Sequence, residues 1–245
     1  MSLLQRLDNL RITNKKGLAV LVDPDSHSDL KNLVQVAGKN KIDTFFIGGS
    51  LLTSDSLDDT LKVIKSESNI PTYIFPGSSS QISNLADGIL FLSLISGRNP
   101  DYLIGQQVNA APLIKQANID VIPTGYVLVD GGTQTSVSYM SNTTPIPHDK
   151  SSIAAATSLA GQYLGLKMIY MEAGSGAKNC VSKKMISTVK NATDIPLIVG
   201  GGIRTIENAK DALTAGADMI VVGNHLEKNP DFIVDLMNLI DEFNN

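Results

Sequence analysis

The stretch IPLIVGGGIRTIENAKDALTAGADMIVVGN, residues Ile195–Asn224, decides the fold. Its apolar runs Leu197–Val199 and Met219–Val222 are expected to be buried parallel strands, and the amphipathic segment Thr205–Ala215 between them a helix. Each strand runs directly into a turn that contains glycine. Turns of this kind bring backbone N–H groups to one place, which is how barrel enzymes hold a phosphate. The stretch therefore predicts a protein that handles a phosphorylated small molecule.

The same alternation of strand and helix repeats along the 245 residues, about every 25 to 30 residues, as βα units require. The expected strands are Leu18–Asp23, Thr44–Ile47, Thr72–Phe75, Ile89–Leu92, Val121–Thr124, Met168–Met171, Leu197–Val199 and Met219–Val222. The expected helices are Leu30–Asn40, Ser56–Ser68, Asp101–Ala117, Ser151–Leu164, Ser182–Ala192, Thr205–Ala215 and Pro230–Phe243, with a further helix in the first 17 residues. The crossover Pro76–Asp87 is short and polar, so we expect a loop or a single turn there.

These elements predict an α/β fold, a modified (β/α)8 TIM barrel in one domain over residues 1–245, with an N-terminal helix and a weak or missing third helix. An open doubly wound sheet is the structural alternative, because alternating βα units alone do not distinguish the two folds. The strand count and the glycine turns after the late strands favour the barrel. The polar segment Leu128–Lys150 follows the fifth strand and is expected to cover the substrate.

Composition limits the class of protein. Hydrophobic residues make up 42% and charged residues 18%, which allows a full-sized core. A net charge of −4 and the absence of any basic stripe argue against a nucleic-acid partner. One cysteine excludes an intramolecular disulfide framework, and no uncharged run reaches the length of a membrane-spanning helix. The N-terminus lacks the unbroken apolar core of a signal peptide, so we expect a cytoplasmic protein.

Two glycine turns near the C-terminus are candidates for the phosphate site. Gly200–Gly202 lies between the seventh strand and a helix, and Gly223–Asn224 follows the eighth strand. Because the carboxyl ends of adjacent parallel strands meet at one end of a barrel, both turns can hold one phosphate. The structural alternative is that these glycines only permit tight turns. The paired placement favours the phosphate site.

The segment Tyr170–Gly176, YMEAGSG, is the candidate catalytic segment. Strand alternation sends the side chains of Tyr170 and Glu172 to the same side, which can be the mouth of the barrel. Glu172 can then orient a hydroxyl group and accept its proton, while Gly174 to Gly176 add N–H donors to the phosphate site. The alternative is that Glu172 forms a strand-end ion pair with Arg204 or a lysine.

A carboxylate and a hydroxyl group follow the first two strands. Asp23 begins the sequence Asp-Pro-Asp, and Ser50 follows two glycines. Such hard oxygen ligands suit Mg²⁺ shared with substrate phosphates, and a second anionic group opposite the glycine turns suggests a diphosphate. Asp25 is more simply explained as a cap or turn residue. The three histidines lack the spacing of a zinc site.

Taken together, these motifs resemble the geranylgeranylglyceryl phosphate synthase family, prenyltransferases that join a polyprenyl diphosphate to sn-glycerol 1-phosphate on a modified barrel. The matching segments are VDPD at Val22–Asp25, FIGGS at Phe46–Ser50, YMEAGSG at Tyr170–Gly176, GGGIR at Gly200–Arg204 and VVGN at Val221–Asn224. The resemblance implies that Asp23 and Ser50 bind Mg²⁺ and that Glu172 and Tyr170 act in catalysis. It places the glycerol-phosphate site at Tyr170, Met171, Glu172, Ala173, Gly174, Ser175, Gly176, Gly201, Gly202, Gly223 and Asn224. It also implies a prenyl groove at the third crossover, a geranylgeranyl donor, a homo-oligomer (dimer or hexamer) and transient contact with a membrane.

The chain departs from the family pattern near the first strand. Many members carry a lysine just after or just before the Asp-Pro motif, where this chain has Ser26 and Leu21, so another residue such as His27 is expected to make that contact. Two other functions stay open from the residues alone. One is a phosphosugar isomerase or synthase with Asp23 and Asp130 as an acid/base pair. The other is a barrel that binds a phosphometabolite without catalysis.

Overall fold

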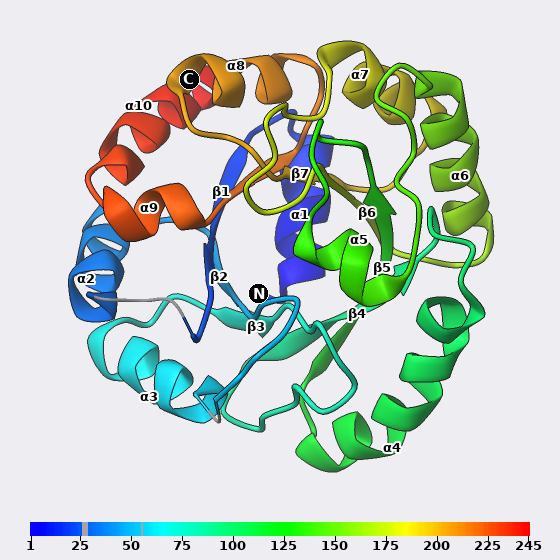
Figure 1. Cartoon of the computed structure of the whole chain (residues 1–245). Coiled ribbons are helices and arrows are strands. Elements are labelled where there is room, and N and C mark those ends of the chain that lie inside the picture. The colour runs from blue at the N-terminus through cyan, green and yellow to red at the C-terminus, as the bar shows by residue number, and fades with distance from the viewer. Residues whose placement is uncertain (26–28, 55) are drawn as a thin grey trace.

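The computed structural model describes residues 1–25, 29–54 and 56–245, and shows one closed barrel of parallel strands ringed by helices (Figure 1). The strands pair in sequence order, and the last closes on the first, with Gly17 opposite Met219. They are β1 (Gly17–Val22), β2 (Thr44–Ile47), β3 (Thr72–Ile74), β4 (Gly88–Leu94), β5 (Asp120–Leu128), β6 (Met168–Glu172), β7 (Leu197–Gly200) and β8 (Met219–Val222). The predicted barrel is confirmed, and the open doubly wound sheet is excluded.

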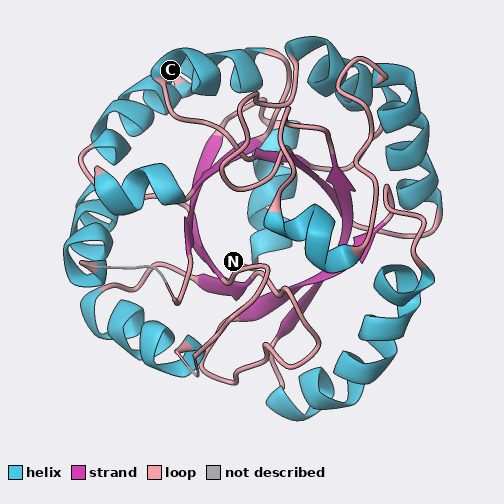
Figure 2. Ribbon diagram, viewed as in Figure 1, coloured by secondary structure: helices cyan, strands magenta, loops and turns pink. Residues whose placement is uncertain are grey.

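Most of the helices form an outer layer around the strands, with loops at both ends of the strands (Figure 2). They are α1 (Leu3–Ile12), α2 (Leu30–Asn40), α3 (Leu57–Glu67), the π-helical turn η1 (Asp101–Gly105), α4 (Gln106–Ala117), α5 (Ser136–Ser141), α6 (Ser151–Tyr163), α7 (Lys183–Ala192), α8 (Ile206–Thr214), α9 (Asn224–Lys228) and α10 (Phe232–Asn244). Among the described residues, no helix combines the length and apolar character needed to cross a membrane.

Strand alternation divides the core into two layers. In β6, Met168 and Tyr170 point into the barrel, where they pack with Phe46 of β2. The alternate residues of the strand, Ile169 and Met171, point outward and pack under the helices. The predicted orientation of Tyr170 toward the barrel interior follows from this alternation and is confirmed.

Helix α1 closes the end of the barrel at which the strands begin. A capping box between Ser2 and Gln5 starts the helix, and its side chains Leu3, Leu7 and Leu10 pack inside the barrel. The Leu3 N–H donates to the hydroxyl of Tyr73 in β3 at 2.9 Å. In Figure 1 this helix is visible through the ring of strands. Helix α1 therefore closes this end of the barrel, and the cavity opens at the end where the strands terminate.

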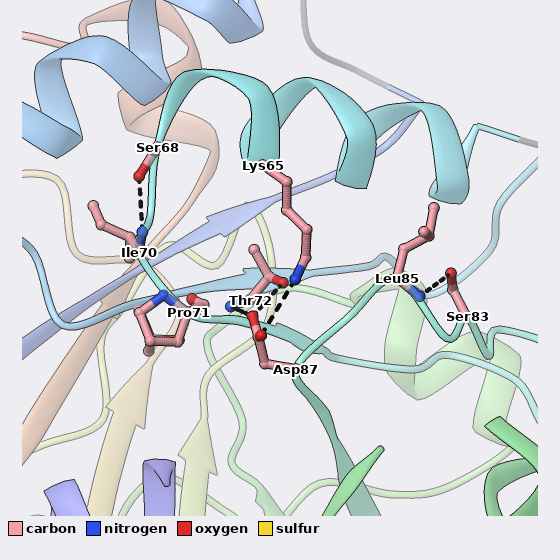
Figure 3. A network of polar contacts seen from close by, with 9 residues as sticks. Lys65, Ser68, Ile70, Pro71, Thr72, Ser83, Leu85 and Asp87 are labelled. Atoms are coloured by element: carbon pink, nitrogen blue, oxygen red, sulfur yellow. Dashed lines mark hydrogen bonds and ion pairs between the residues drawn. The ribbon is translucent and has the colours of Figure 1, made fainter. Parts of the chain in front are cut away.

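The crossover from β3 to β4 contains no helix, as the sequence predicts. Asp87, at its end, holds the crossover against the barrel (Figure 3). Its carboxylate accepts hydrogen bonds from the N–H and the hydroxyl of Thr72, at 2.8 and 3.0 Å, and from Lys65 of α3 at 3.2 Å. The ring of helices is thus interrupted between α3 and α4, and the hydrogen bonds of Asp87 hold the end of the connecting chain in place.

Three elements differ from the prediction. The segment Leu128–Lys150 is not only loop, since its centre forms α5, which begins with a capping box between Thr135 and Ser138. The helix expected at Asp101–Ala117 starts with the π-helical turn η1. The short helix α9 follows β8 directly, where no helix was expected. All three lie beside the open end of the barrel.

Candidate active site

A cavity of about 650 Å³ opens at the end of the barrel where the strands terminate. Its walls bring together residues that follow β1, β2, β6, β7 and β8, as the sequence predicts for the mouth of a barrel. The predicted site residues that line it are Asp23, Ser50, Tyr170, Glu172, Ser175, Gly176, Gly201, Gly202, Gly223 and Asn224. Segments up to 201 positions apart in sequence therefore share one cavity.

Glu172 is a buried carboxylate in the wall of this cavity. It is the last residue of β6, and its Oε1 accepts a hydrogen bond from the N–H of Gly174 at 2.7 Å. Burial raises the pKa of Glu172 to about 7, with the Gly174 N–H opposing that rise. A carboxyl group with such a pKa can gain and lose a proton near neutrality, as a general base must.

Glycines create the space that Glu172 occupies. A Cβ on Gly201 would collide with Oε1 of Glu172, and a Cβ on Gly200 would come within 3.0 Å of its Oε2. Gly201 also has a φ of +81°, which side-chain-bearing residues rarely adopt. The glycine turn after β7 is thus required by the carboxylate as well as by the backbone path.

An aromatic cluster forms the base of the cavity. Tyr170 stacks on Phe75 with ring centroids 5.0 Å apart, and Tyr126 lies 5.7 Å from Tyr170. The Tyr170 hydroxyl is buried and has no partner with hydrogen-bond geometry among the described residues. Burial, together with the nearby Glu172 carboxylate, raises the pKa of Tyr170 well above its usual value, so the phenol stays protonated. The phenol can therefore donate a hydrogen bond either to the neighbouring Glu172 carboxylate, which interacts with it, or to a substrate.

Backbone N–H groups line the opposite side of the cavity. Within the described part of the chain, the N–H groups of Ser175, Gly176, Gly201, Gly202, Gly223 and Asn224 donate no hydrogen bond. The Ser175 hydroxyl donates to the side-chain oxygen of Asn224 at 3.1 Å, which ties the β6 turn to the β8 turn. Unpaired N–H groups from neighbouring turns form a site suited to an anion. The predicted phosphate site is consistent with this geometry.

Three of the predicted glycerol-phosphate residues do not line the cavity. The side chains of Met171 and Ala173 pack outward under the helices, so neither lines the cavity. The Gly174 N–H was expected to bind phosphate but is already bonded to Glu172. The suggested pairing of Glu172 with Arg204 is also not found, because Arg204 donates to the carbonyl of Ala177 at 2.8 Å.

Asp23 and Ser50 lie together on the wall formed by β1 and β2. The Asp23 carboxylate packs against Gly49, where an added Cβ would come within 3.1 Å of its oxygens. One carboxylate oxygen accepts a hydrogen bond from the Asp25 N–H at 3.0 Å, and the carboxylate lines the cavity. No group of three or more His, Cys, Asp or Glu residues in the described chain is arranged to hold a metal alone. A carboxylate and a hydroxyl fit an ion such as Mg²⁺, which takes most of its ligands from water and substrate phosphates.

Asp25 has the structural role that the sequence favoured. Its carboxylate accepts hydrogen bonds from the N–H and hydroxyl of Thr53 and from the hydroxyls of Ser54 and Ser56. These hydrogen bonds, that from Ser54 most strongly, hold the pKa of Asp25 well below its usual range. The residue therefore fixes the loop after β2, which carries Ser50. The suggested contact of Ser26 or His27 lies outside the described residues.

The cavity continues into an apolar groove beside the helix-free crossover. Apolar side chains from the crossover, β4, α4 and α5 line it, namely Phe75, Ile82, Leu92, Ala110, Ile114, Val137 and Met140. The segment Leu128–Lys150 was expected to cover the substrate and does line the cavity, but its helix α5 was not predicted, and the capping Thr135 packs on Gly174 of the catalytic segment. The capping signal Thr-x-x-Ser was present in the sequence, but it does not indicate where the helix docks.

Asp130, the other candidate acid/base residue, does not line the cavity and accepts a hydrogen bond from the N–H of Gly132.

Comparison with known proteins assigns the family. A sequence model of the PcrB family matches residues 10–240. The chain belongs to the PcrB family. A relative from Spirosoma linguale, a geranylgeranylglyceryl phosphate synthase, is 48% identical over 97% of this chain and 96% of its own length. Another from Pyrococcus furiosus, with the same name, is 41% identical over 91% of this chain and 89% of its own.

Solved structures agree with this assignment. The chain superimposes with a TM-score of 0.90 on the Thermoplasma acidophilum (S)-3-O-geranylgeranylglyceryl phosphate synthase, whose structure contains its substrate sn-glycerol-1-phosphate. The two chains are 36% identical, and the match covers 99% of this chain and 98% of the other. The family resemblance read from the sequence motifs is confirmed.

Proposed function

We propose that this protein joins a polyprenyl diphosphate, specifically geranylgeranyl diphosphate, to sn-glycerol 1-phosphate through an ether bond and releases diphosphate. One observation carries the proposal. A single cavity combines unpaired N–H groups on one wall, a buried carboxylate, and an apolar groove beside the helix-free crossover. These features match, in order, a phosphate, a hydroxyl group that must lose a proton, and a long apolar chain. The prediction of a prenyltransferase is supported by relatives that cover nearly the whole chain.

The chemical step is a displacement at the allylic carbon C1 of the prenyl group. The C1–O bond breaks and its electron pair goes to the departing diphosphate, while an oxygen of glycerol 1-phosphate forms the new bond to C1. Glu172 accepts the hydroxyl proton, and its pKa of about 7 suits that role. The protonated Tyr170 donates a hydrogen bond to the same part of the substrate. The turns after β6, β7 and β8 hold the glycerol phosphate in position.

Mg²⁺ is part of this proposal, with Asp23 and Ser50 as its protein ligands. When bound, the ion supplies positive charge that stabilises the departing diphosphate. The Asp23 carboxylate packs against Gly49, and Asp25 holds the loop that carries Ser50, which supports this pair as the protein ligands. This wall lies beside β8, whose turn contributes to the glycerol-phosphate site.

The proposal is tested by incubating the protein with sn-glycerol 1-phosphate, Mg²⁺ and prenyl diphosphates of graded length, and measuring the ether product. Controls replace the substrate with sn-glycerol 3-phosphate or add EDTA. We expect a product that requires metal and forms only from the 1-phosphate. Absence of product with every chain length would refute the proposal and favour a barrel that binds a phosphometabolite without catalysis.

The phosphosugar isomerase alternative loses its second catalytic group in this structure. That reaction was expected to use Asp23 and Asp130 across the mouth of the barrel. Asp130 is exposed outside the cavity, with its carboxylate turned to the backbone of Gly132. We therefore do not retain this alternative.

We further propose that the protein is a homo-oligomer. Residues 102–114 and 151–166 contain no charged residue, although they include most of the surface helix α4 and all of α6. Large apolar side chains are exposed there, with Tyr163 78% and Leu164 81% accessible. An exposed, uncharged apolar face on two neighbouring helices is typical of a protein–protein interface. A second copy of this chain fits such a face, because no charges oppose its self-association.

A further inference from the structure

The cavity has few positive charges for the substrates proposed above, and the inference that follows depends on that proposed function. A phosphomonoester carries roughly −1.5 to −2 charges at neutral pH, and a diphosphate adds further negative charge. The carboxylates of Asp23, Glu172 and Glu227 also line the cavity. Among the described lining residues, only Arg204 and Lys228 carry a permanent positive charge. Within the described lining, these two side chains are therefore the cations that can compensate anionic charge alongside the backbone N–H groups and Mg²⁺.

Arg204 lies on the glycerol-phosphate side. It follows the glycine turn after β7, and its Nη2 donates to the carbonyl of Ala177 in the loop after β6. The guanidinium group is thus tied between the two turns whose N–H groups are unpaired. This position associates Arg204 with the phosphate of glycerol 1-phosphate.

Lys228 lies on a different side. It ends α9, and this helix packs against β1, the strand that leads into Asp23, and against α2. Leu226 anchors α9 in the core with no exposed surface, and the ring of His225 packs edge-on against Phe232 at 4.9 Å. These contacts fix the helix and so fix where the lysine side chain begins.

The ammonium group of Lys228 has no partner among the described residues. It forms no ion pair or hydrogen bond with any residue in the described part of the chain, and the side chain is exposed at the cavity wall. Several other lysines form an ion pair with a carboxylate, as Lys190 does with Asp218 at 2.6 Å. A flexible cation that lines a cavity without a partner is suited to an anionic ligand.

We propose that Lys228 binds the diphosphate of the prenyl substrate and neutralises charge on the diphosphate as it departs. Helix α9 contacts β1, the strand that ends just before Asp23, so this cation lies on the side of the cavity that carries the proposed Mg²⁺ ligands. Lys228 then acts on the diphosphate together with the ion, while Arg204 and the glycine turns hold the other substrate. The diphosphate and the phosphate of glycerol 1-phosphate are thus bound by different residues.

The test compares Lys228→Gln with Lys210→Gln, a matched loss of one positive charge on α8 at an exposed position away from the cavity. Steady-state kinetics give KM for each substrate, and calorimetry gives the Kd of inorganic diphosphate with and without Mg²⁺. Lys228→Gln should raise KM for the prenyl diphosphate and the Kd of diphosphate about tenfold, as expected for one charged hydrogen bond at an exposed site. KM for glycerol 1-phosphate should change less than twofold. Lys228→Arg should restore most of the affinity, and Lys210→Gln should behave as wild type.

Two results would overturn the proposal: unchanged diphosphate affinity in a folded Lys228→Gln protein, or an increase confined to KM for glycerol 1-phosphate. Thermal unfolding of each variant establishes that it is folded, and Lys228→Ala provides a second variant. The diphosphate titration does not require turnover, so it separates this inference from the proposed function. Lys228-dependent diphosphate binding in a protein without ether synthase activity would keep the anion site and reject the reaction.

Discussion

Replacing Glu172 with Gln should make the protein more stable at pH 8 while it removes activity. Burial raises the pKa of Glu172 from 4.5 to about 7. Between these pH values the folded protein holds a proton that the unfolded chain has released, so the free energy of unfolding falls as pH rises through this window. At about 1.4 kcal/mol per pH unit, the ionised side chain costs about 3 kcal/mol above pH 7.

Glutamine keeps the shape of the side chain and can still accept the hydrogen bond of the Gly174 N–H. The variant therefore loses the buried charge and little else. We expect its free energy of unfolding to exceed that of wild type by up to about 3 kcal/mol at pH 8, and the difference to shrink toward zero near pH 4.5. Turnover should fall by about 10²- to 10⁴-fold, the usual contribution of a general base.

Urea unfolding followed by circular dichroism at pH 5, 6.5 and 8 measures the stability, and product formation at the same pH values measures the activity. Glu242→Gln, at an exposed position on α10, is the matched control and should change neither quantity. The reasoning fails if Glu172→Gln is no more stable than wild type at pH 8, or if its advantage does not depend on pH. Unchanged turnover in the folded variant would remove Glu172 from the role of base.

Three further changes test other parts of the structure. Gly201→Ala should destabilise the protein by at least about 1–2 kcal/mol because Gly201 has a positive φ, and it should reduce turnover by displacing Glu172. Its control, Gly38→Ala, lies in open space on α2 and should be neutral or stabilising. Equal effects of the two variants on the free energy of unfolding and on turnover would contradict this prediction. Asp87→Ala should cost about 1–3 kcal/mol in urea unfolding, since the buried Thr72 loses its acceptor, and a cost below about 0.5 kcal/mol would show that the network in Figure 3 is not needed. Leu164→Glu should dissociate the oligomer in sedimentation experiments, and an unchanged mass would place the interface elsewhere.

The barrel could be predicted because its signals are local. Apolar runs of strand length recur between amphipathic segments, and the observed β6, Met168–Glu172, extends the predicted strand by one residue. Alternation along that strand also gave the common orientation of Tyr170 and Glu172. The helix-free third crossover followed from its polar, glycine- and serine-rich composition. These features depend on neighbours in sequence, which is why one sequence was enough.

The contacts within the site could not be predicted in the same way. The N–H of Gly174 bonds to Glu172 instead of remaining free for phosphate, and this depends on how the loop turns after β6. Arg204 bonds to a carbonyl in the same loop, and Asp130 turns away from the cavity. Helix α5 carries its own capping signal, yet its place over Gly174 is set by tertiary packing. Chemical type can be read from sequence, but the partner of each polar group cannot.

The position of α1 has a consequence for the order of folding. This helix precedes every strand in the sequence, and its side chains belong to one apolar cluster with Ala19 of β1, Tyr73 of β3 and Met219 of β8. The surface that receives it is complete only when β8 pairs with β1. Contacts between distant parts of a chain form slowly, because a long loop must close first. We expect the amides of α1 to gain protection from hydrogen exchange later than those of the central strands, so that a helix that precedes every strand in the sequence is among the last elements to be fixed.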